Sequence, residues 1–427
     1  MKLLIKNGRV VDPASAMDET MDILVDRGKI IDIKPRVEAS KDWKVIDASR
    51  LVVAPGFIDM HTHVREPGQE EKEDIETASR AAAKGGFTSI CAMPNTNPVN
   101  DNRGVTEYLF AEAKKRAIVN LFPIAAISMG LRGEELTDMA DLRSAGVVAF
   151  SDDGRCIQNN QLMRRALEYT NFLGVVLIDH CEDFSLSQDG LMHEGFYSYL
   201  FGLKGIPASA EEVMVARDLI LAEESRARVH IAHLSTRGAV RLVEEAKKRG
   251  VRVTAEVTPH HLTLTDSALT NYDTRLKVNP PLRSQEDVQA LLAALKSGVI
   301  DALATDHAPH TTEEKDVEFD RALFGINGLE TAVSLMLDRL VNKNAISLGR
   351  FIELISTNPA RILGLKDKGS LAVGKDADIT ILNLHKEIVV DIFKFASKSR
   401  NNPFHGWKLK GAPVMTIVAG KVVYPFS

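Results

Sequence analysis

The sequence predicts an α/β protein, namely a (β/α)8 barrel of the TIM type with a small β-sandwich domain formed by the N- and C-terminal segments. Three observations predict this fold. Short apolar segments alternate with amphipathic helical patterns through the middle of the chain, and both ends carry Val- and Ile-rich segments broken by Gly, Asp or Pro. In addition, a length of 427 residues suits one large barrel with an accessory domain.

The two ends of the chain are expected to pair with each other. Strand-like segments are Leu3–Val11, Asp22–Ile33, Lys44–Val53, Asp378–Leu382 and Val414–Tyr424, the last with Ala419-Gly420 as its hairpin turn. Neither end has enough apolar residues for a core of its own, so two independent β modules are disfavoured. We therefore assign residues 1–54 and 366–427 to a composite β-sandwich domain and residues 55–365 to the barrel.

Eight apolar segments are the predicted strands of the barrel. They are Val53–Met60, Thr88–Met93, Asn120–Ile127, Val147–Ser151, Val175–Asp179, Val229–His233, Val251–Val257 and Ala302–Thr305. Amphipathic patterns such as Ile75–Lys84, Gly104–Arg116 and Glu286–Lys296 lie between them. Eight alternations of strand and helix favour a closed parallel barrel over a doubly wound sheet.

Composition and charge narrow the function classes. The formal net charge is −5 and no basic block stands out, which argues against nucleic acid as a partner. The three cysteines are scattered and form no CxxC pair, which argues against disulfides and a thiolate zinc site and for a reducing compartment. The N-terminus does not resemble a signal peptide, and no apolar run reaches the roughly 18 residues of a membrane span. We expect a cytoplasmic protein that does not enter membranes.

The first barrel strand leads into His61-Thr62-His63, which is a candidate metal-binding motif. Alternate residues of a strand point to the same side, so the two imidazoles share one face. At the C-terminal end of a barrel strand that face opens onto the active-site mouth, where two imidazoles suit a borderline-soft ion such as zinc. The motif alone is equally compatible with two ordinary polar side chains.

Later strands also end in residues that bind metals. Ser151-Asp152-Asp153-Gly154 closes the fourth strand, Asp179-His180-Cys181 the fifth, Ile231-Ala232-His233 the sixth and Thr305-Asp306-His307 the eighth. A single His at a strand end is more often a satisfied polar residue than a ligand. Five strand ends that supply His or Asp to the same rim are hard to explain by packing, so we predict a metal centre there.

The order of these residues resembles the amidohydrolase superfamily, and within it the dihydroorotase family over essentially the whole chain. The stretches that carry the resemblance are PGFIDMHTHVREPG (55–68), AMPNTNPV (92–99), FSDDG (150–154), DHCED (179–183), HIAHLST (230–236), EVTPHHL (256–262), KVNPPLR (277–283) and ATDHAPH (304–310). Each stretch alone is only suggestive, whereas the whole set is specific. The resemblance implies reversible hydrolysis of (S)-dihydroorotate to N-carbamoyl-L-aspartate in pyrimidine (UMP) biosynthesis.

The resemblance also implies the metal ligands. One zinc ion would bind His61, His63 and Asp306, and a second would bind His180 and His233, with Asp153 as the bridge. Many relatives bridge the two ions with a carboxylated lysine, but this sequence has no lysine between Lys115 and Lys204. A carboxylate can still hold two ions roughly 3.5–4 Å apart, so the first zinc is the central expectation and the occupancy of the second stays open. Asp152 is the competing bridge, but Asp153 matches the second Asp of the family motif.

The expected substrate carries a carboxylate, which calls for a fixed guanidinium. Arg65 lies two residues beyond His63 on the same alternation, although spacing alone equally allows a surface ion pair. The resemblance adds further groups that bind substrate: His63, Asn95, Asn279, His310, Phe324 and Gly325. It also implies that Asp306 takes a proton from the attacking water and delivers it to the ring nitrogen.

The segment 311–325 after the eighth strand is polar, charged and ends in glycine. We interpret it as a long loop that closes over the site, with a disordered surface loop as the alternative. His260 and His261 are excluded as ligands, because neighbouring strand residues point to opposite faces.

Three other functions compete with this interpretation. Allantoinase and dihydropyrimidinase share the metal motif, but dihydropyrimidinase substrates lack the carboxylate that Arg65 would bind. An inactive dihydroorotase-like subunit that scaffolds aspartate transcarbamoylase is the third, although all six ligand positions are filled here. The resemblance leaves open a homodimer and a complex with aspartate transcarbamoylase.

Overall fold

The barrel predicted for the middle of the chain is present in the computed structural model, which describes residues 2–426. Its strands are β6 (Phe57–Thr62), β7 (Phe87–Ala92), β8 (Asn120–Pro123), β9 (Ala149–Ser151), β10 (Val176–Asp179), β13 (Val229–Ile231), β14 (Val253–Val257) and β15 (Ala302–Leu303). They pair in parallel as β6-β7-β8 and as β9-β10-β13-β14-β15. Parallel bridges between Ala125 and Phe150 and between Thr62 and His307 join the two sheets into a closed ring.

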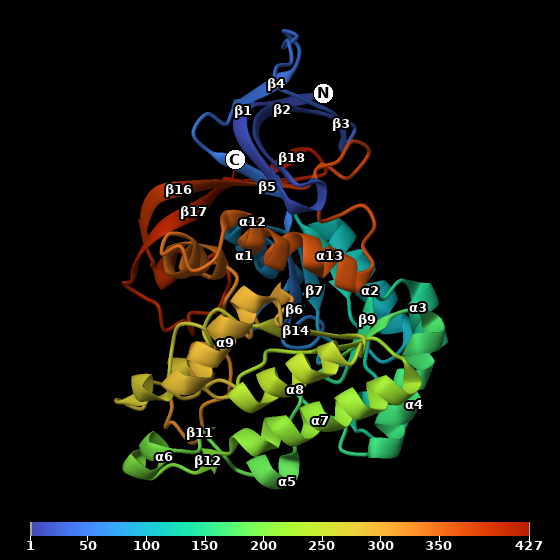
Figure 1. Cartoon of the computed structure of the whole chain (residues 1–427), viewed down its shortest axis with the longest axis vertical. Helices are drawn as coiled ribbons and strands as arrows, with labels where there is room; N and C mark the ends of the chain where they lie inside the picture. Colours follow the sequence, from blue (N-terminus) through green and yellow to red (C-terminus); the bar gives the residue numbers. More distant parts are fainter. Residues whose placement is uncertain (1, 427) are drawn as a thin grey trace.

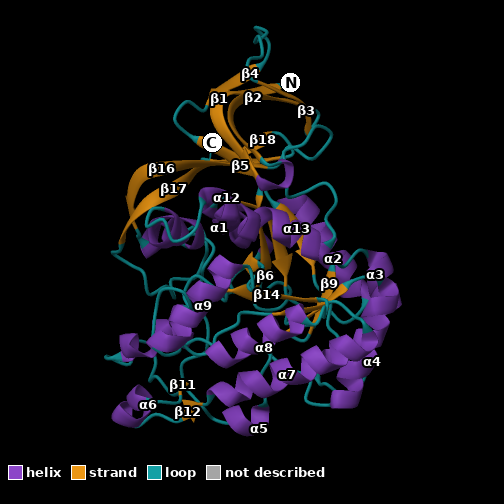
Figure 2. Cartoon of the chain, in the orientation of Figure 1, coloured by secondary structure: helices purple, strands orange, loops and turns teal. Residues whose placement is uncertain are grey.

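Helices surround the barrel in the order that the sequence predicts (Figures 1 and 2). The longer ones are α1 (Ile75–Gly85), α2 (Arg103–Arg116), α3 (Met139–Ala145), α4 (Asn160–Leu173), α7 (Ala208–Ser225), α8 (Arg237–Lys248) and α9 (Gln285–Ser297). The predicted helices at Ile75–Lys84, Gly104–Arg116 and Glu286–Lys296 are therefore confirmed. Helix α1 begins where Asp74 and Thr77 form a reciprocal capping box and ends at Gly86 in the left-handed conformation.

Strands from both ends of the chain form one eight-stranded sheet, as the sequence predicts. They are β1 (Leu3–Asp12), β2 (Met17–Asp26), β3 (Lys29–Lys34), β4 (Lys44–Asp47), β5 (Val52–Pro55), β16 (Ile379–Val389), β17 (Lys408–Val418) and β18 (Lys421–Tyr424). The two ends join where β5 pairs antiparallel with β16, with Val53 opposite Ile381. Apolar residues of both ends share one buried cluster, so neither end has its own core.

The predicted strand Val53–Met60 is wrong in one respect, because it contains parts of two strands. Strand β5 belongs to the terminal sheet, and β6 starts the barrel after Gly56. A Cβ atom at Gly56 would lie 2.2 Å from Thr88 Oγ1, so only glycine fits at this passage. An apolar run in the sequence indicates that the segment is buried, but it does not show that the chain passes from one sheet to another.

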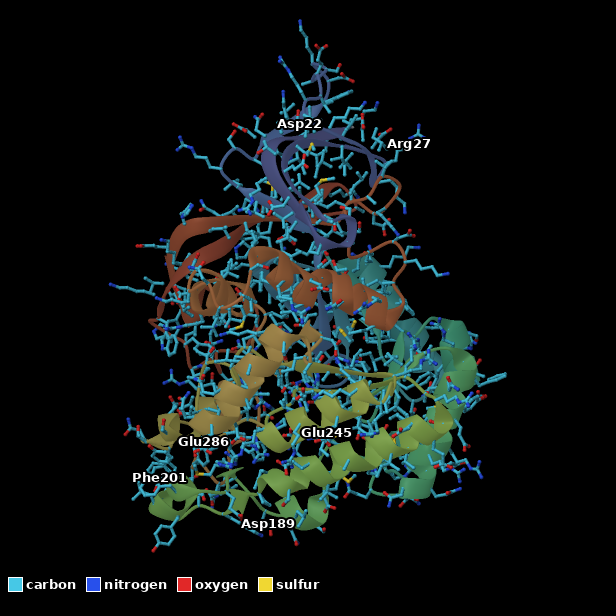
Figure 3. The ribbon with its side chains drawn as sticks, in the orientation of Figure 1. Asp22, Arg27, Asp189, Phe201, Glu245 and Glu286 are labelled. Carbon is cyan, nitrogen blue, oxygen red and sulfur yellow. The ribbon has the colours of Figure 1, made fainter. Side chains whose placement is uncertain are left out.

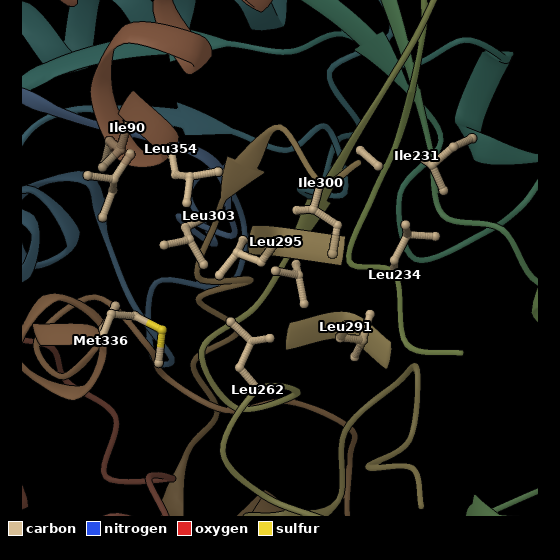
Figure 4. Close-up of a cluster of buried hydrophobic side chains, with 14 of the residues drawn as sticks. Ile90, Ile231, Leu234, Leu262, Leu291, Leu295, Ile300, Leu303, Met336 and Leu354 are labelled. Atoms are coloured by element: carbon tan, nitrogen blue, oxygen red, sulfur yellow. The ribbon is translucent and has the colours of Figure 1, made fainter. Parts of the chain in front are cut away.

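The main apolar core lies between the barrel strands and the helices around them. Figure 4 shows part of it, where Leu295 of α9 lies beside Leu303 of β15. Burial of each such side chain stabilises the fold by about 1.5–3 kcal/mol. This packing holds the strand ends, and therefore the side chains that project from them, in fixed positions.

Four of the remaining short elements extend the molecule at the end opposite the terminal sheet (Figure 1): α5 (Phe184–Ser187), β11 (Met192–His193), α6 (Phe196–Phe201) and β12 (Gly205–Ile206). Near the terminal sheet, α11 (Ala332–Met336) contacts β17, α12 (Leu348–Ile352) contacts β1, and α13 (Asn358–Leu363) contacts β6. Helix α10 (Thr312–Lys315) lies in the loop that follows the eighth barrel strand. Figure 3 shows the two ends, with Asp22 and Arg27 in the terminal sheet and Asp189 and Phe201 at the far end. None of the helices within residues 2–426 is long and apolar enough to cross a membrane.

Candidate metal centre and substrate cavity

The six predicted metal ligands converge at the C-terminal ends of the barrel strands, with Asp153 at their centre. Asp153 Oδ1 lies 3.1 Å from His61 Nε2, 3.6 Å from His233 Nε2 and 3.7 Å from His180 Nδ1. Its other oxygen lies 3.4 Å from His63 Nε2. One carboxylate therefore contacts the imidazoles of four different residues, which is the arrangement that a bridging ligand requires.

Asp306 completes the cluster on the side of the first two histidines. Its Oδ1 lies 3.1 Å from His63 Nε2 and 3.6 Å from His61 Nε2. Within this cluster of described residues, two groups of donor atoms are close enough to share an ion, namely His61/His63/Asp306 and His61/Asp153/His233. His61 belongs to both groups.

The donor atoms fit a metal ion better than they fit one another. His61 Nε2 and Asp153 Oδ1 are buried and have no hydrogen-bond partner among residues 2–426, although they face each other at 3.1 Å. A buried polar atom without a partner costs about 1–3 kcal/mol. Imidazole nitrogens and carboxylate oxygens in this number suit zinc or a similar divalent ion, whose positive charge would satisfy both atoms.

Electrostatics keep the two carboxylates of the cluster ionised. Burial acts to raise the pKa of Asp153, but the charges and hydrogen bonds of the surrounding histidines lower it well below its usual range. Burial opposes the same effect at Asp306, whose pKa is lowered by His63 and His61. Both side chains are therefore available as anionic ligands.

Asp152, the competing candidate for the bridge between the ions, binds backbone N–H groups outside the cluster. Its Oδ1 accepts hydrogen bonds from the backbone N–H groups of Ile127 (2.7 Å) and Ser128 (3.0 Å). This carboxylate thus ties the end of one barrel strand to the loop after the previous one. The geometry supports the choice of Asp153.

Three histidines of the cluster are oriented by partners on their other ring nitrogen. His61 Nδ1 lies 2.8 Å from Glu256 Oε1, His63 Nδ1 lies 2.9 Å from Asn95 Oδ1, and His180 Nε2 lies 3.0 Å from Glu182 Oε2. Sequence reasoning missed Glu256 and Glu182. The available signal for Glu256 was a carboxylate inside the otherwise apolar segment Val251–Val257.

A cavity of about 250 Å³ adjoins the cluster. It is lined by the predicted substrate-binding residues His63, Arg65, Asn95, Asn279, His310, Phe324 and Gly325, by four more predicted metal ligands besides His63, and by Gly154 and Leu323. The structure therefore brings all the predicted substrate residues to one space. Asn279 donates a hydrogen bond to Glu182 Oε2 (2.8 Å), the same oxygen that contacts the predicted metal ligand His180.

Arg65 is a buried cation without an anionic partner. Only 8% of the residue is exposed, and its Nε donates to the carbonyl of Pro309 (3.1 Å). Within residues 2–426 no carboxylate lies in ion-pair range of its guanidinium, and the two terminal nitrogens donate no hydrogen bond to protein. Burial lowers the pKa of Arg65 to about 10, so the group stays charged at neutral pH. The backbone of Arg65 is left-handed, with φ of 64°; such strain is typical of functional sites.

The segment 311–325 is ordered and lies against the cavity. Lys315, whose side chain is buried, donates hydrogen bonds to the carbonyls of Leu323 (2.7 Å) and Gly325 (3.3 Å). His310 Nε2 contacts the carbonyl of Phe324 at 2.8 Å. These contacts favour the lid interpretation over a disordered loop.

His260 and His261, which were excluded as ligands, are buried near the cluster. His261 contacts Thr258 Oγ1 (2.7 Å) and the carbonyl of Pro280 (2.9 Å) through its two ring nitrogens. Neither histidine belongs to a group of donors close enough to share an ion within residues 2–426.

Comparisons with known proteins agree with this geometry. A family model described as Dihydro-orotase-like matches residues 49–239, and one described as Amidohydrolase family matches residues 210–424. The chain is 53% identical to a dihydroorotase of Syntrophus aciditrophicus over 99% of both chains. It is 56% identical to a dihydroorotase of Pelotomaculum thermopropionicum over 99% of this chain and 98% of the relative.

Solved structures of other cyclic amidohydrolases have the same fold. The L-hydantoinase (dihydropyrimidinase) of Arthrobacter aurescens superposes with a TM-score of 0.90 at 29% identity, covering 99% of this chain and 95% of that one. The dihydropyrimidinase of Brevibacillus agri NCHU1002 superposes with a TM-score of 0.86 at 25% identity and the same coverage.

Proposed function

Because the chain belongs to the dihydroorotase family of amidohydrolases, we propose that it catalyses the reversible hydrolysis of (S)-dihydroorotate to N-carbamoyl-L-aspartate. The chain is accordingly a hydrolase that acts on a cyclic amide. In a cell the same reaction, run toward ring closure, would serve pyrimidine (UMP) biosynthesis.

The observation that carries the choice of substrate is the unpaired guanidinium of Arg65. A buried cation is stabilised by a compensating charge, and in the described chain carboxylates such as Asp306 act on Arg65 only from beyond ion-pair range. A substrate with a ring carboxylate would supply that charge next to the metal cluster. Dihydroorotate has this carboxylate, whereas dihydrouracil does not.

We propose that the cluster binds zinc. His61, His63 and Asp306 would hold the first ion, and His180 and His233 the second, with Asp153 bridging the two. When bound, such an ion polarises a carbonyl and lowers the pKa of a water from 15.7 toward about 7. The proximity of Asp153 to all four histidines supports a carboxylate bridge in the absence of a bridging lysine.

Residues of the chain would carry out the proton transfer and bind the substrate. Asp306, held ionised beside His63, would accept the proton of the attacking water and return it to the departing ring nitrogen. Arg65 would fix the substrate carboxylate through a charge-assisted hydrogen bond. Further polar contacts to the ring would come from His63, Asn95, Asn279, His310 and the backbone of Phe324 and Gly325, all of which line the cavity.

Side-by-side turnover of dihydroorotate, allantoin and dihydrouracil by the purified protein tests this proposal. We expect turnover of dihydroorotate and little of the other two, since only dihydroorotate offers a carboxylate to Arg65. Activity confined to allantoin or to dihydrouracil would overturn the proposal.

The domain division, the cellular location and the association with other subunits are also proposals. We propose that residues 1–54 with 366–427 and residues 55–365 are the two domains, which the passage at Gly56 supports. The three buried free thiols support a cytoplasmic location. Association into a homodimer or with aspartate transcarbamoylase is testable by light scattering of the protein with and without that enzyme. The scaffold alternative requires a protein that binds no zinc.

A further inference from the structure

Below the metal centre, a buried line of hydrogen bonds runs through the barrel and ends on His61. It starts at Thr254 of β14, whose Oγ1 lies 2.8 Å from His230 Nδ1 on the adjacent strand β13. His230 Nε2 lies 3.1 Å from Glu256 Oε2, and Glu256 Oε1 lies 2.8 Å from His61 Nδ1. His61, His230 and Glu256 are at most 1% exposed.

This line occupies the interior face of β14. Side chains alternate along a strand, so Val253, Ala255 and Val257 pack into the core beneath the helices while Glu256 points to the other side. The interior of the barrel nearby is apolar and includes Ile58 and Met60. A carboxylate in such a place needs a specific reason, because burial of an ionised group without a compensating charge is costly.

Glu256 has no cationic side chain to compensate it. Its ion-pair contacts within residues 2–426 are only the two imidazoles of His61 and His230. Each of its two oxygens faces one ring nitrogen, Oε1 that of His61 and Oε2 that of His230. A cation bound at His61 Nε2 would place a compensating charge one imidazole ring away.

His61 also lies close to donor atoms on both sides of the cluster. It is common to both groups of donor atoms, whereas His63 and His233 each belong to one. When Nδ1 donates its proton to Glu256, the lone pair of Nε2 faces Asp153 and Asp306, which fixes both the tautomer and the direction of the ring.

We propose that Glu256, supported by His230 and Thr254, is a positioning residue for metal binding: it holds His61 in the tautomer and orientation that present Nε2 to the first ion. Neither Glu256 nor His230 has a role in the proposed reaction, although both lie in stretches that carry the family resemblance. The inference rests on the proposed function because it requires that a metal binds.

The test measures metal binding directly by the full-length protein. Zinc is removed by chelation, and the affinity of the apo protein for Zn²⁺ is then determined by competition with a chromogenic chelator. Glu256→Gln keeps the volume of the side chain and removes its charge, so we expect affinity to fall about 10- to 100-fold. Cobalt-loaded Glu256→Gln should also show altered visible absorption bands, which a purely structural residue would not change.

Three variants serve as matched controls. Glu256→Asp keeps the charge at a shorter reach and should recover part of the affinity, and it carries the test if Glu256→Gln fails to fold. Thr254→Val removes only the outermost hydrogen bond and should weaken binding less than Glu256→Gln. Glu182→Gln removes the partner of His180 and should weaken only the second ion.

The outcomes separate this inference from the proposed function. Wild-type protein that binds zinc, together with Glu256→Gln protein that is folded and binds it equally well, would overturn the role of Glu256 alone. Wild-type protein that binds no zinc would overturn the metal centre and this inference with it. A loss of thermal stability in apo Glu256→Gln with unchanged zinc affinity would identify a merely structural carboxylate.

Discussion

The two halves of the site are built in different ways. Metal-binding side chains project from strand ends, and their charges compensate one another, since carboxylates lie between imidazoles. Substrate-binding groups such as Arg65, His310 and Phe324 lie on loops, where Arg65 contacts the carbonyl of Pro309 and His310 contacts the carbonyl of Phe324. The metal-binding, strand-borne half therefore sets carboxylates against imidazoles, whereas the substrate-binding, loop-borne half keeps a buried positive charge for a ligand to neutralise.

The comparison teaches which half controls which kinetic parameter. Interactions at the reacting atoms change kcat, whereas interactions that hold a remote part of the substrate change mainly KM. Substitutions of the metal-binding residues at the strand ends should therefore abolish turnover. Substitutions of the substrate-binding residues on the loops should weaken substrate binding and specificity.

Asp306→Asn is expected to have the largest effect. Asn has the same shape but does not accept the proton, so kcat should fall by about 10² to 10⁴-fold, the usual contribution of general acid–base catalysis. Steady-state kinetics on protein whose metal content has been verified will measure it. If metal-loaded Asp306→Asn turned over as fast as the wild type, the assignment of the proton acceptor would be wrong.

Arg65→Met comes next and probes the loop-borne half. A hydrogen bond to a charged group contributes about 1.5–3 kcal/mol, so kcat/KM for dihydroorotate should fall roughly 10- to 100-fold, mostly through KM. Arg65→Lys should restore little, because lysine lacks the bidentate fork. Equal kcat/KM in wild type and Arg65→Met would contradict the role of Arg65 in binding the carboxylate.

Lys315→Met tests the loop through the pH dependence of stability. Burial, followed by the charge of Lys277, lowers the pKa of Lys315 from 10.5 to about 7. Between these values the unfolded chain binds the additional proton, so the free energy of unfolding of the wild type should rise with pH relative to Lys315→Met. Urea denaturation of both proteins at pH 7 and pH 9 measures this difference. A constant difference at the two pH values would show that Lys315 does not titrate there.

Lys72→Met should have the smallest effect. Its Nζ lies 2.7 Å from Glu314 Oε1 at the edge of the loop, where both side chains are partly exposed. Exposed ion pairs contribute about 0.2–1 kcal/mol, so kcat/KM should change by less than about fivefold, and less in high salt. A larger loss would mean that this pair holds the loop over the cavity.

Most of the strand-borne half could be predicted from the sequence. An alternation of apolar strands and helices defines the barrel, and each ligand follows a strand at the rim where side chains converge. The residues His61, Asp153 and Asp306 could be placed there because strand ends of a parallel barrel meet at one face. Glu256 escaped notice because it touches His61 from a different strand, and such pairing depends on the register across the barrel.

The loop-borne half was less predictable. The composition of residues 311–325 left open a disordered loop, because nothing in a polar sequence reveals that Lys315 is buried against backbone carbonyls. The change of sheet at Gly56 was also missed inside the predicted strand Val53–Met60, although the proposed domain boundary falls next to it, since the apolar run continues across two sheets. Both the conformation of this loop and the change of sheet depend on contacts between residues that are distant in the sequence.

Metal removal and return tests the central claim most directly. Hydrolysis of dihydroorotate is measured with protein stripped by a chelator, with the same protein reloaded with zinc, and with bound metal counted in each sample. The account predicts that the stripped protein has almost no turnover and that one or two equivalents of zinc restore it. Full turnover of dihydroorotate by protein that contains no metal would contradict the account.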